Sequence, residues 1–293
     1  MKLVFIGFGE AAYNIAAGLK SEGLDEMGAF DVCAREPVRG KIIRERAKEL
    51  GVVLFEDLSE ACKKGEFIFS LTSAKVAVSV AKEAFQYLGK KQVYIDMNSA
   101  APTVKEQIET LPRAAGVLFC DAGVMGTVPG NQHKVPMFLS GDGAVAFSEK
   151  FAPLGMNLKV LAVPAGGASA IKMFKSVVMK GLPQLMFESF EGAQKYGVLD
   201  ILVESLSGSL EGKSIQKLAN TFIARTLIHA ERRSAEMKDV VKTLEALDVN
   251  AAMSKATVAK LDQMAGQDWM NLLGEGASSL GYQDAMKKYM DLK

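Results

Sequence analysis

Short apolar runs alternate with amphipathic segments along the first half of the chain. The runs are bounded by turn residues or charge, as buried strands are, and the segments between them carry apolar residues at helical spacing. This alternation is typical of βαβ units around a parallel sheet. The predicted strands are residues 3–6, 30–34, 67–71, 93–97 and 117–120, with two short ones near 137–140 and 158–163. The predicted helices between them are residues 11–21, 39–50, 58–62, 76–88 and 104–111.

After Pro164 the periodicity is helical throughout. A long helix is predicted from about residue 168 to 196, bent near Pro183, and further helices cover 214–226, 228–247 and 251–264. The fold class is therefore α/β: an N-terminal Rossmann-type, doubly wound parallel sheet over residues 1–162, followed by an all-α domain over residues 163–293.

Composition adds few constraints. The chain has 293 residues and a formal net charge of +1, so nothing attracts it generally to nucleic acid or to an acidic membrane. No uncharged stretch reaches the roughly 18 residues of a membrane span. Three scattered cysteines, Cys33, Cys62 and Cys120, form no disulfide framework, which favours a reducing, cytoplasmic location. With only two histidines no metal site is expected, and His133 is expected at the surface.

A glycine-rich turn follows the first predicted strand and opens the first helix. It reads Gly7-Phe8-Gly9-Glu10-Ala11-Ala12. Gly7 permits the tight turn, Gly9 leaves the backbone bare for a diphosphate, and Ala12 allows close packing of helix on strand. The helix N-terminus adds partial positive charge. The motif predicts dinucleotide binding, against the alternative of a purely structural turn.

The end of the second strand selects the dinucleotide. An acidic residue there holds the ribose 2′-hydroxyl of NAD, whereas an arginine accommodates the 2′-phosphate of NADP. If the strand runs to Ala34, Arg35 takes this position, Arg39 follows one turn later, and Asp31 lies within the strand. A shift of one residue would place Glu36 there instead. The sequence thus predicts NADP, with NAD possible, and a solvated basic helix start as the alternative.

Four segments together resemble the β-hydroxyacid dehydrogenase superfamily, which includes 3-hydroxyisobutyrate and 6-phosphogluconate dehydrogenases and the imine reductases. The resemblance covers nearly the whole chain and implies a nicotinamide-dependent oxidoreductase, a homodimer or larger, whose helical domain serves substrate binding and dimerisation. The C-terminal part is similar to a less characterised branch, with Lys180-Gly181 and a motif around Glu236-Met237. The four segments are Ile6-Gly7-Phe8-Gly9, residues 95–102, residues 121–127 and residues 167–173.

The resemblance makes Lys172 the catalytic acid or base. Oxidation of a hydroxyl requires a group of near-neutral pKa to take its proton, and desolvation or neighbouring cations such as Lys175 and Lys180 can lower the pKa of a lysine that far. The family usually has asparagine where this chain has Ser176, which is the second candidate catalytic residue. A solvated lysine stripe is the alternative.

The same resemblance implies the remaining contacts. The substrate loop departs from the family pattern, because Met125 replaces a serine and Thr127 replaces a glycine, and this puts a standard short hydroxy acid in doubt. Glu236 lies near the position of a family lysine, with a solvated, salt-bridged face as the alternative. The expected cofactor contacts beyond the glycine turn and Arg35 are Leu71, Thr72, Ser73 and Asn98; the expected substrate contacts are Val124, Met125, Gly126, Thr127, Lys175, Lys180 and Glu236.

Three functions follow from these features. The first is an NADP-preferring oxidoreductase that moves hydride between nicotinamide and a small, anionic hydroxy or oxo compound. The second is an imine reductase, which shares the architecture without requiring a lysine in its proton relay. The third is a catalytically silent NADP-binding protein, motivated by Met125 and Ser176.

Overall fold

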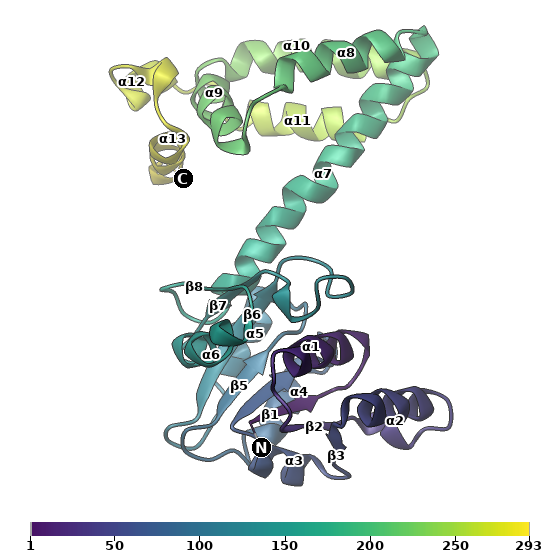
Figure 1. Cartoon of the computed structure of the whole chain (residues 1–293). Helices are drawn as coiled ribbons and strands as arrows, with labels where there is room; N and C mark the ends of the chain where they lie inside the picture. Colours follow the sequence, from purple (N-terminus) through teal and green to yellow (C-terminus); the bar gives the residue numbers. More distant parts are fainter. Residues whose placement is uncertain (1, 293) are drawn as a thin grey trace. The chain divides into compact units, whose positions relative to one another are not determined.

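A computed structural model describes residues 2–292. Within them, eight strands form one sheet in the order β3-β2-β1-β4-β5-β6-β7-β8. All neighbouring strands are parallel except β6 and β7 (Figure 1). The chain divides into two compact units, one up to Val177 and one from Val178 onward.

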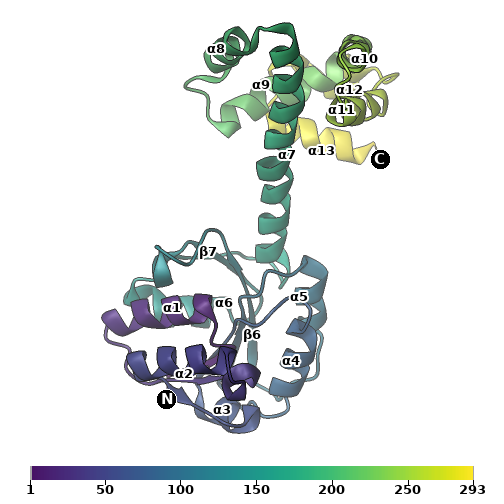
Figure 2. The same ribbon diagram turned by 90° about the vertical axis from the view of Figure 1, so that its right-hand side faces the viewer.

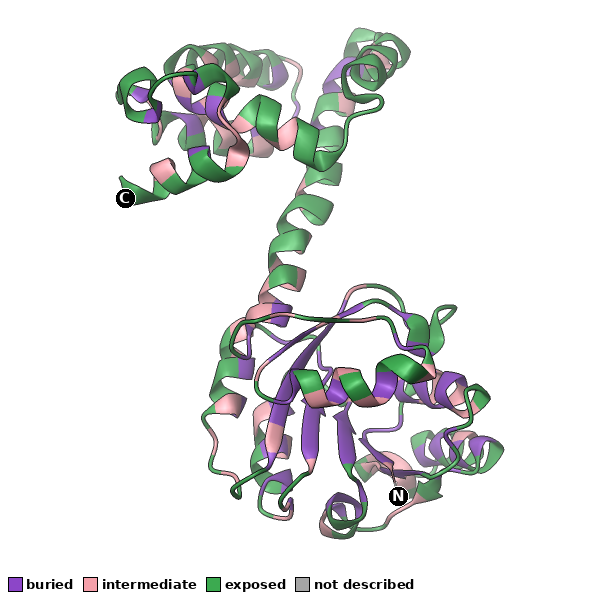
Figure 3. Ribbon diagram, turned by 60° about the vertical axis from the view of Figure 1, so that its left-hand side comes forward, coloured by how far each residue is buried: buried purple, intermediate pink, exposed green. Residues whose placement is uncertain are grey.

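The strands of the first unit are short and follow the apolar runs of the sequence. They are β1 (Leu3–Ile6), β2 (Met27–Phe30), β3 (Val53–Leu54), β4 (Phe67–Ser70), β5 (Val93–Asp96), β6 (Leu118–Val124), β7 (Met137–Ser140) and β8 (Leu158–Val160). Residues of the central strands β1, β4, β5 and β6 are almost entirely buried, as expected for a sheet covered on both faces (Figure 3).

Helices cover both faces of this sheet (Figure 2). One face packs against α1 (Glu10–Ser21), α2 (Arg39–Leu50) and α6 (Ala144–Phe151) in a core rich in phenylalanine. The other face packs against α3 (Leu58–Lys64), α4 (Ala77–Ala84) and α5 (Pro102–Glu109). The fold class predicted from the sequence is therefore confirmed.

The second unit is helical. The long helix α7 (Gly167–Tyr196) continues into it from the first unit. Two small cores form there, one around Trp269 and one around Leu244. The remaining helices are α8 (Leu199–Leu210), α9 (Ile215–Ile228), α10 (Ala230–Ala246), α11 (Ala252–Asp262), α12 (Trp269–Leu273) and α13 (Tyr282–Asp291). None of the helices within residues 2–292 combines the length and apolarity needed to cross a membrane.

Several predicted boundaries need correction. The second strand is Met27–Phe30 and not 30–34, because Asp31 caps the short 3₁₀ helix η1 (Val32–Arg35) that follows it. Gly28 and Ala29 have weak strand propensity and concealed its true start. The helix α6 and the two-residue strand β3 were not predicted, and β7 runs antiparallel. The unit boundary lies inside α7, whose first turns pack with the sheet, whereas the sequence placed the domain boundary before the helix.

The polar loop that contains His133 also differs from expectation. His133 is buried against α1, because Gly18 has no side chain and leaves room for the imidazole ring. The ring faces the Glu22 carboxylate at 3.6 Å, and burial is the main cause of its lowered pKa. His133 therefore helps to attach the loop to α1.

Candidate active site at the carboxyl edge of the sheet

The carboxyl ends of four neighbouring strands are in register. Ile6 of β1 pairs with Ser70 of β4, Ser70 with Asp96 of β5, and Asp96 with Asp121 of β6. The loops that leave these strands therefore emerge at one edge of the sheet. In open α/β sheets this edge is where ligands bind. Three of the four residues in the row are polar and fully buried, namely Ser70, Asp96 and Asp121.

The glycine turn after β1 has the geometry of a diphosphate site. Gly7 adopts φ +86°, and a Cβ atom there would lie 2.5 Å from the backbone oxygen of Leu71, so both its conformation and its space require glycine. Gly9 has no atom within 4 Å of the corresponding position. In α1 the first amide with an acceptor among the described residues is that of Tyr13, which bonds to Gly9 O at 3.0 Å. The amides before it are available to an anion, so this turn fits the diphosphate of a dinucleotide.

Asp31 takes the position at the end of the second strand. Its Oδ2 accepts a hydrogen bond of 2.7 Å from the Phe8 amide, and its Oδ1 accepts one of 2.9 Å from the Cys33 amide. The sequence had placed Arg35 there. In the structure Arg35 lies at the end of η1, exposed, with an ion pair of 3.0 Å to Glu56. The residue that immediately follows β2 is thus a carboxylate held against the glycine turn.

A cavity of about 350 Å³ lies beside Asp31. Its charged lining consists of Asp31 and Glu56 together with Arg35 and Arg44. The side chain of Arg44 donates to the carbonyl of Ala34 in η1. Charges of both signs therefore balance in the cavity, which lies where the adenosine end of a dinucleotide on the glycine turn would extend.

The loop after β5 holds Asn98 in a fixed orientation. Its amide side chain donates to Asp96 Oδ2 at 2.9 Å and to Ser70 Oγ at 3.2 Å, while its backbone amide donates to Asp96 Oδ1 at 3.0 Å. Thr72 Oγ1 lies 3.4 Å from Asn98 Oδ1. Two of the predicted cofactor contacts, Thr72 and Asn98, are therefore neighbours. Ser73 is exposed beside them and Leu71 is partly buried.

Lys172 reaches the same edge from the first turns of α7. Its Nζ donates a hydrogen bond of 2.6 Å to Ser99 Oγ, one residue after Asn98. Partial burial is the main cause that lowers the pKa of Lys172, the ammonium of Lys105 lowers it further, and the Asp121 carboxylate opposes both. The pKa of Lys172 thus shifts in the direction that a proton-transferring lysine requires.

The start of α7 is bonded directly to the sheet. Asp121 Oδ2 accepts hydrogen bonds from the amides of Gly166 and Ser169, at 3.1 and 2.9 Å, and Asp121 Oδ1 accepts one of 2.7 Å from Ser169 Oγ. The Ala168 amide donates to Ser140 Oγ on β7 at 3.0 Å. The amides at the N-terminus of α7, which have no acceptor within the helix, thus bond to side chains of β6 and β7. A Cβ at Gly123 would lie 2.7 Å from Ala168 O, so glycine there permits this close approach.

Lys105 lies beneath this contact and is completely buried. Its ammonium bonds to a side-chain oxygen of Asp96, to Asp96 O at 3.0 Å, and to Asp121 Oδ1 at 3.4 Å. The one cation thus bridges two carboxylates on adjacent strands. Asp96 orients Asn98 and Asp121 holds α7, so Lys105 connects the loop after β5 with the helix that carries Lys172.

Ser176 is close to Lys172, but its hydroxyl does not bond to the Lys172 amine. Its hydroxyl donates to the backbone oxygen of Lys172 at 3.1 Å, whereas the amine is bonded to Ser99. The residue whose hydroxyl lies beside the Lys172 amine is therefore Ser99 and not Ser176. Ser176 remains a predicted site residue without such a contact.

The predicted substrate residues fall into two groups. Val124 ends β6, and Met125, Gly126 and Thr127 continue from it as a loop that is increasingly exposed. Met125 and Lys175 line a common cavity of about 400 Å³ together with Phe138 and Lys159. Lys180 and Glu236 belong to the second unit, where both are exposed and Glu236 forms an ion pair with Arg232 at 2.5 Å.

Sequence reasoning had not assigned roles to Ser99, Asp96, Lys105, Asp121 or Ser140. A usable signal existed for the two aspartates, because each stands where an apolar run meets polar residues and parallel strands end at one edge. Lys105 carried no such signal, since a lysine in an amphipathic helix is usually solvated. Only the fold shows that it points inward.

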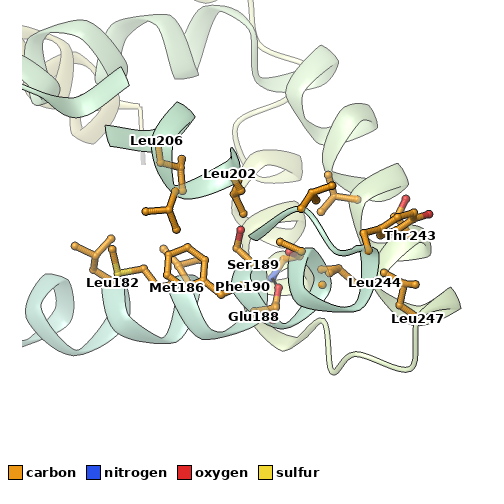
Figure 4. Close-up of a pocket in the computed structure, with 18 of the residues that line it drawn as sticks. Leu182, Met186, Glu188, Ser189, Phe190, Leu202, Leu206, Thr243, Leu244 and Leu247 are labelled. Carbon is orange, nitrogen blue, oxygen red and sulfur yellow. Dashed lines mark hydrogen bonds between the residues drawn. The ribbon is translucent and has the colours of Figure 1, made fainter. Parts of the chain in front are cut away.

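A cavity larger than these two is lined by residues 182–254. It has a volume of about 1040 Å³, belongs to the second unit, and is lined mainly by apolar side chains of α7, α8 and α10 (Figure 4). Its buried carboxylate, Glu188, accepts hydrogen bonds from the amides of Met253 and Ser254 and so caps α11. Because this carboxylate is engaged in the fold, the cavity offers little for chemistry, and the site is assigned to the sheet edge.

The sheet edge, the glycine turn and the lysine on the following helix define a dinucleotide-binding protein. Residues 2–154 match the model of the NAD-binding domain of 6-phosphogluconate dehydrogenase, and residues 193–264 match a domain of unknown function, DUF1932. The first match spans more than half of the chain. The chain therefore belongs to the 6-phosphogluconate dehydrogenase family of NAD-binding domains, within the β-hydroxyacid dehydrogenase superfamily.

Solved structures agree with this assignment. A conserved hypothetical protein from Sinorhizobium meliloti 1021 is 31% identical, with a TM-score of 0.65 over 98% of this chain and 95% of that one. A conserved protein of unknown function, described as structurally similar to 3-hydroxyacid dehydrogenases, is 27% identical, with a TM-score of 0.63 over 90% and 96% of the two chains. The V8 variant of an imine reductase from Myxococcus stipitatus, solved with NAD⁺, shares the fold at 15% identity, with a TM-score of 0.71 over 98% of this chain and 99% of that one.

Proposed function

We propose that this protein is a nicotinamide-dependent oxidoreductase acting on a hydroxy or oxo compound, with Lys172 as its proton donor or acceptor. The hydrogen bond of 2.6 Å from Lys172 Nζ to Ser99 Oγ carries this proposal. It brings a lysine with a lowered pKa to the carboxyl edge of the sheet, beside the loop that contains Asn98. Membership of the superfamily and the similarity to a 3-hydroxyacid dehydrogenase-like structure support it.

Each group has a distinct task in this mechanism. The open amides at the start of α1 and the bare backbone of Gly9 bind the diphosphate. Asn98, fixed by Asp96 and Ser70, would orient the loop that receives the nicotinamide end. When bound, nicotinamide supplies hydride-transfer chemistry. Lys172 takes the hydroxyl proton during oxidation or returns it during reduction, and Ser99 Oγ holds the amine in place between these events.

The preferred dinucleotide depends on Asp31. The prediction of NADP assumed that the second strand reaches Ala34, which would place Arg35 at its end. In the structure β2 ends at Phe30, so Arg35 does not occupy that position. A carboxylate directly after this strand, about 20 residues beyond the glycine turn, is the usual partner of the ribose 2′-hydroxyl. Arg35 is already paired with Glu56, whose charge would repel a 2′-phosphate. We therefore propose NAD as the preferred cofactor, with Arg35 and Arg44 as the groups that would receive the phosphate of NADP.

Calorimetric titration with NADH and NADPH tests the cofactor assignment. The wild-type chain should bind NADH more tightly than NADPH, and Asp31→Asn should narrow or reverse this preference. The control is Asp25→Asn, an exposed carboxylate that precedes β2. Tighter binding of NADPH by the wild type would reverse the proposed preference, and no binding of either cofactor at millimolar concentration would contradict the proposed function.

Replacement of Lys172 separates the hydroxy-compound reaction from imine reduction. With a panel of hydroxy acids, aldehydes and imines, Lys172→Ala should lower kcat roughly 10²–10⁴-fold on the hydroxy or oxo substrate, the usual contribution of a positioned acid or base. Lys82→Ala, which removes an exposed lysine of α4 that has no place in the proposed site, is the control. Little loss with Lys172→Ala would favour the imine reductase alternative, and cofactor binding without turnover on any compound would favour the silent protein.

We also propose that the chain forms a homodimer. Along α7, large apolar side chains are exposed, including Phe174 at 70%, Val177 at 71% and Phe187 at 72%. Exposed apolar surface of this kind marks protein interaction sites. Light scattering should give twice the mass of the 31.5 kDa chain, and Phe187→Asp should shift the protein toward monomer. A wild-type mass equal to one chain would contradict the proposal.

A further inference from the structure

Lys105 is unusual among the lysines of the first unit, because its side chain is completely buried in the sheet's core. An ammonium group has three donors. Here they face Asp96 Oδ1, Asp96 O at 3.0 Å and Asp121 Oδ1 at 3.4 Å. The cation is thus fully satisfied by two strand ends, and it lies below the edge where the cofactor and Lys172 meet.

Both carboxylates have further partners on the site side. Asp96 accepts from the backbone and side-chain amides of Asn98, and Asp121 accepts from Gly166 and Ser169 at the start of α7. Without the counter-charge of Lys105, these two carboxylates would be buried next to each other with a net charge of −2. Lys105 therefore holds together the two anchors of the site.

Stability alone does not account for an ionic group at this place. Burying an ion pair costs desolvation free energy that its attraction repays only in part, and well-packed apolar side chains of similar volume often stabilise a core equally well. The carboxylates are needed here to hold Asn98 and α7, and the cation is needed to compensate them. After burial, the charge of Lys105 is the second cause that lowers the pKa of the Lys172 amine.

We propose that Lys105 is a positioning residue for Lys172: it compensates Asp121, which fixes the first turn of α7, and it sets the net charge of the buried cluster that holds this turn. The effect on catalysis rests on the proposed function, whereas the control of Lys172 itself does not. In an oxidation Lys172 would need to be neutral to accept the proton, so a nearby buried cation that favours the neutral amine would widen the pH range of activity.

Several charged groups surround the start of α7. Lys105 favours the neutral form of Lys172, and Asp121 favours its charged form. Asp96 pairs with Lys105 and compensates its charge. On α5, Glu106 lies near Gly166, where an added Cβ would be 3.1 Å from its Oε1, and Glu109 accepts from the Ala165 amide at 3.4 Å.

On α7 itself, Lys175 is exposed, so solvent screens its charge. Among the groups that face the start of α7, the buried ones, Lys105, Asp96 and Asp121, should therefore dominate.

The test measures the titration of Lys172 directly. Full-length protein is labelled with trace acetic anhydride from pH 7 to 12, and mass spectrometry gives the acetylation of Lys172 relative to an internal amine standard. Lys105→Met should raise the midpoint of Lys172, because a cation is lost and two carboxylates remain. Asp96→Asn should lower the midpoint, and Lys105→Met/Asp96→Asn should return it close to the wild-type value.

Opposite shifts distinguish positioning from a merely structural role, which would move both midpoints the same way. Lys20→Met, a partly buried lysine on α1 that bonds to Leu50 O, is the control and should leave the midpoint of Lys172 unchanged. Circular dichroism checks that each variant is folded. If Lys105→Met does not fold, Asp96→Asn still tests the sign, since Lys105 keeps Asp121 as its partner.

Equal midpoints in wild type and Asp96→Asn, or a wild-type midpoint at the ordinary pKa of lysine, would overturn the proposal. The measurement needs neither cofactor nor substrate. A chain that binds no dinucleotide but shows the opposite shifts would therefore contradict the proposed function and leave the control of Lys172 by Lys105 standing.

Discussion

The charged side chains at the two ends of the carboxyl edge differ in burial. At the β5–β6 end, Lys105, Asp96 and Asp121 are fully buried and connected to backbone groups. At the β2 end, Arg35 and Glu56 pair in solvent, with side chains 73% and 86% exposed. A buried charge that loses its partner is not solvated by water, whereas an exposed charge is. The first end is thus built for rigid placement of reacting groups, and the second for adjustable contact with a ligand.

The largest effect should come from removing an anchor at the buried end. Asp121→Ala leaves Lys105 with one carboxylate and removes the acceptor of Gly166 and Ser169. We expect a loss of about 3–5 kcal/mol in the free energy of unfolding, measured by urea denaturation. Glu56→Ala at the open end is the control and should change it by less than about 1 kcal/mol. Similar losses of unfolding free energy in the two variants would contradict the proposed difference between the buried and the exposed end.

Gly7→Ala should give the next largest effect, because it tests the one crowded position of the glycine turn. A Cβ would lie 2.5 Å from Leu71 O at a φ of +86°. We expect a loss of roughly 1–3 kcal/mol in the free energy of unfolding, as is usual for a strained backbone conformation. Thermal unfolding would show this as a lowered Tm even without ligand. An unchanged Tm would contradict this prediction and would mean that the backbone near Leu71 can move to accommodate the added methyl group.

Gly9→Ala separates folding from binding two residues further on. Nothing lies within 4 Å of the added methyl group, and Gly9 has an ordinary φ of −76° at the N-cap of α1. The free energy of unfolding should change by less than about 1 kcal/mol. The affinity for NADH should fall, because the methyl group occupies space meant for the diphosphate. Calorimetry beside thermal unfolding checks both, and unchanged affinity would place the diphosphate elsewhere.

The smallest effect is expected for Arg35→Ala at the open end. The ion pair with Glu56 is exposed, so its loss should change the free energy of unfolding by no more than about 0–1 kcal/mol, and by less at high salt. If NAD is preferred, the affinity for NADH should stay nearly constant while that for NADPH declines. A large drop in NADH affinity would show that Arg35, and not Asp31, holds the adenosine ribose.

The candidate site could be predicted from the sequence in part. The glycine turn is contiguous, so the spacing of Gly7, Gly9 and Ala12 alone predicts a dinucleotide-binding motif. Lys172 and Asn98 were found through segments that resemble a family. Ser99 and Lys105 were missed, because their importance arises from partners 73 and 9 residues away, respectively.

The position of Asp31 was predicted wrongly, because the predicted end of the second strand was wrong. A change of four residues in the end of β2 exchanged an arginine for a carboxylate at the position that selects the cofactor. Strand ends are set by capping and pairing, and here the Asp31 carboxylate caps η1 while Met27–Phe30 pair with β1. Such competition between a turn and a strand cannot be resolved from hydropathy alone.

The sequence by itself determined the class of fold, the glycine turn and the helix that carries the lysine, because periodicity and local motifs depend on neighbours along the chain. The tertiary structure decided which polar residues share the edge of the sheet, because strand order and register bring Ser70, Asp96 and Asp121 into one row. It also decided that Lys105 is buried, since the desolvation of a charge is compensated only where distant carboxylates converge on it.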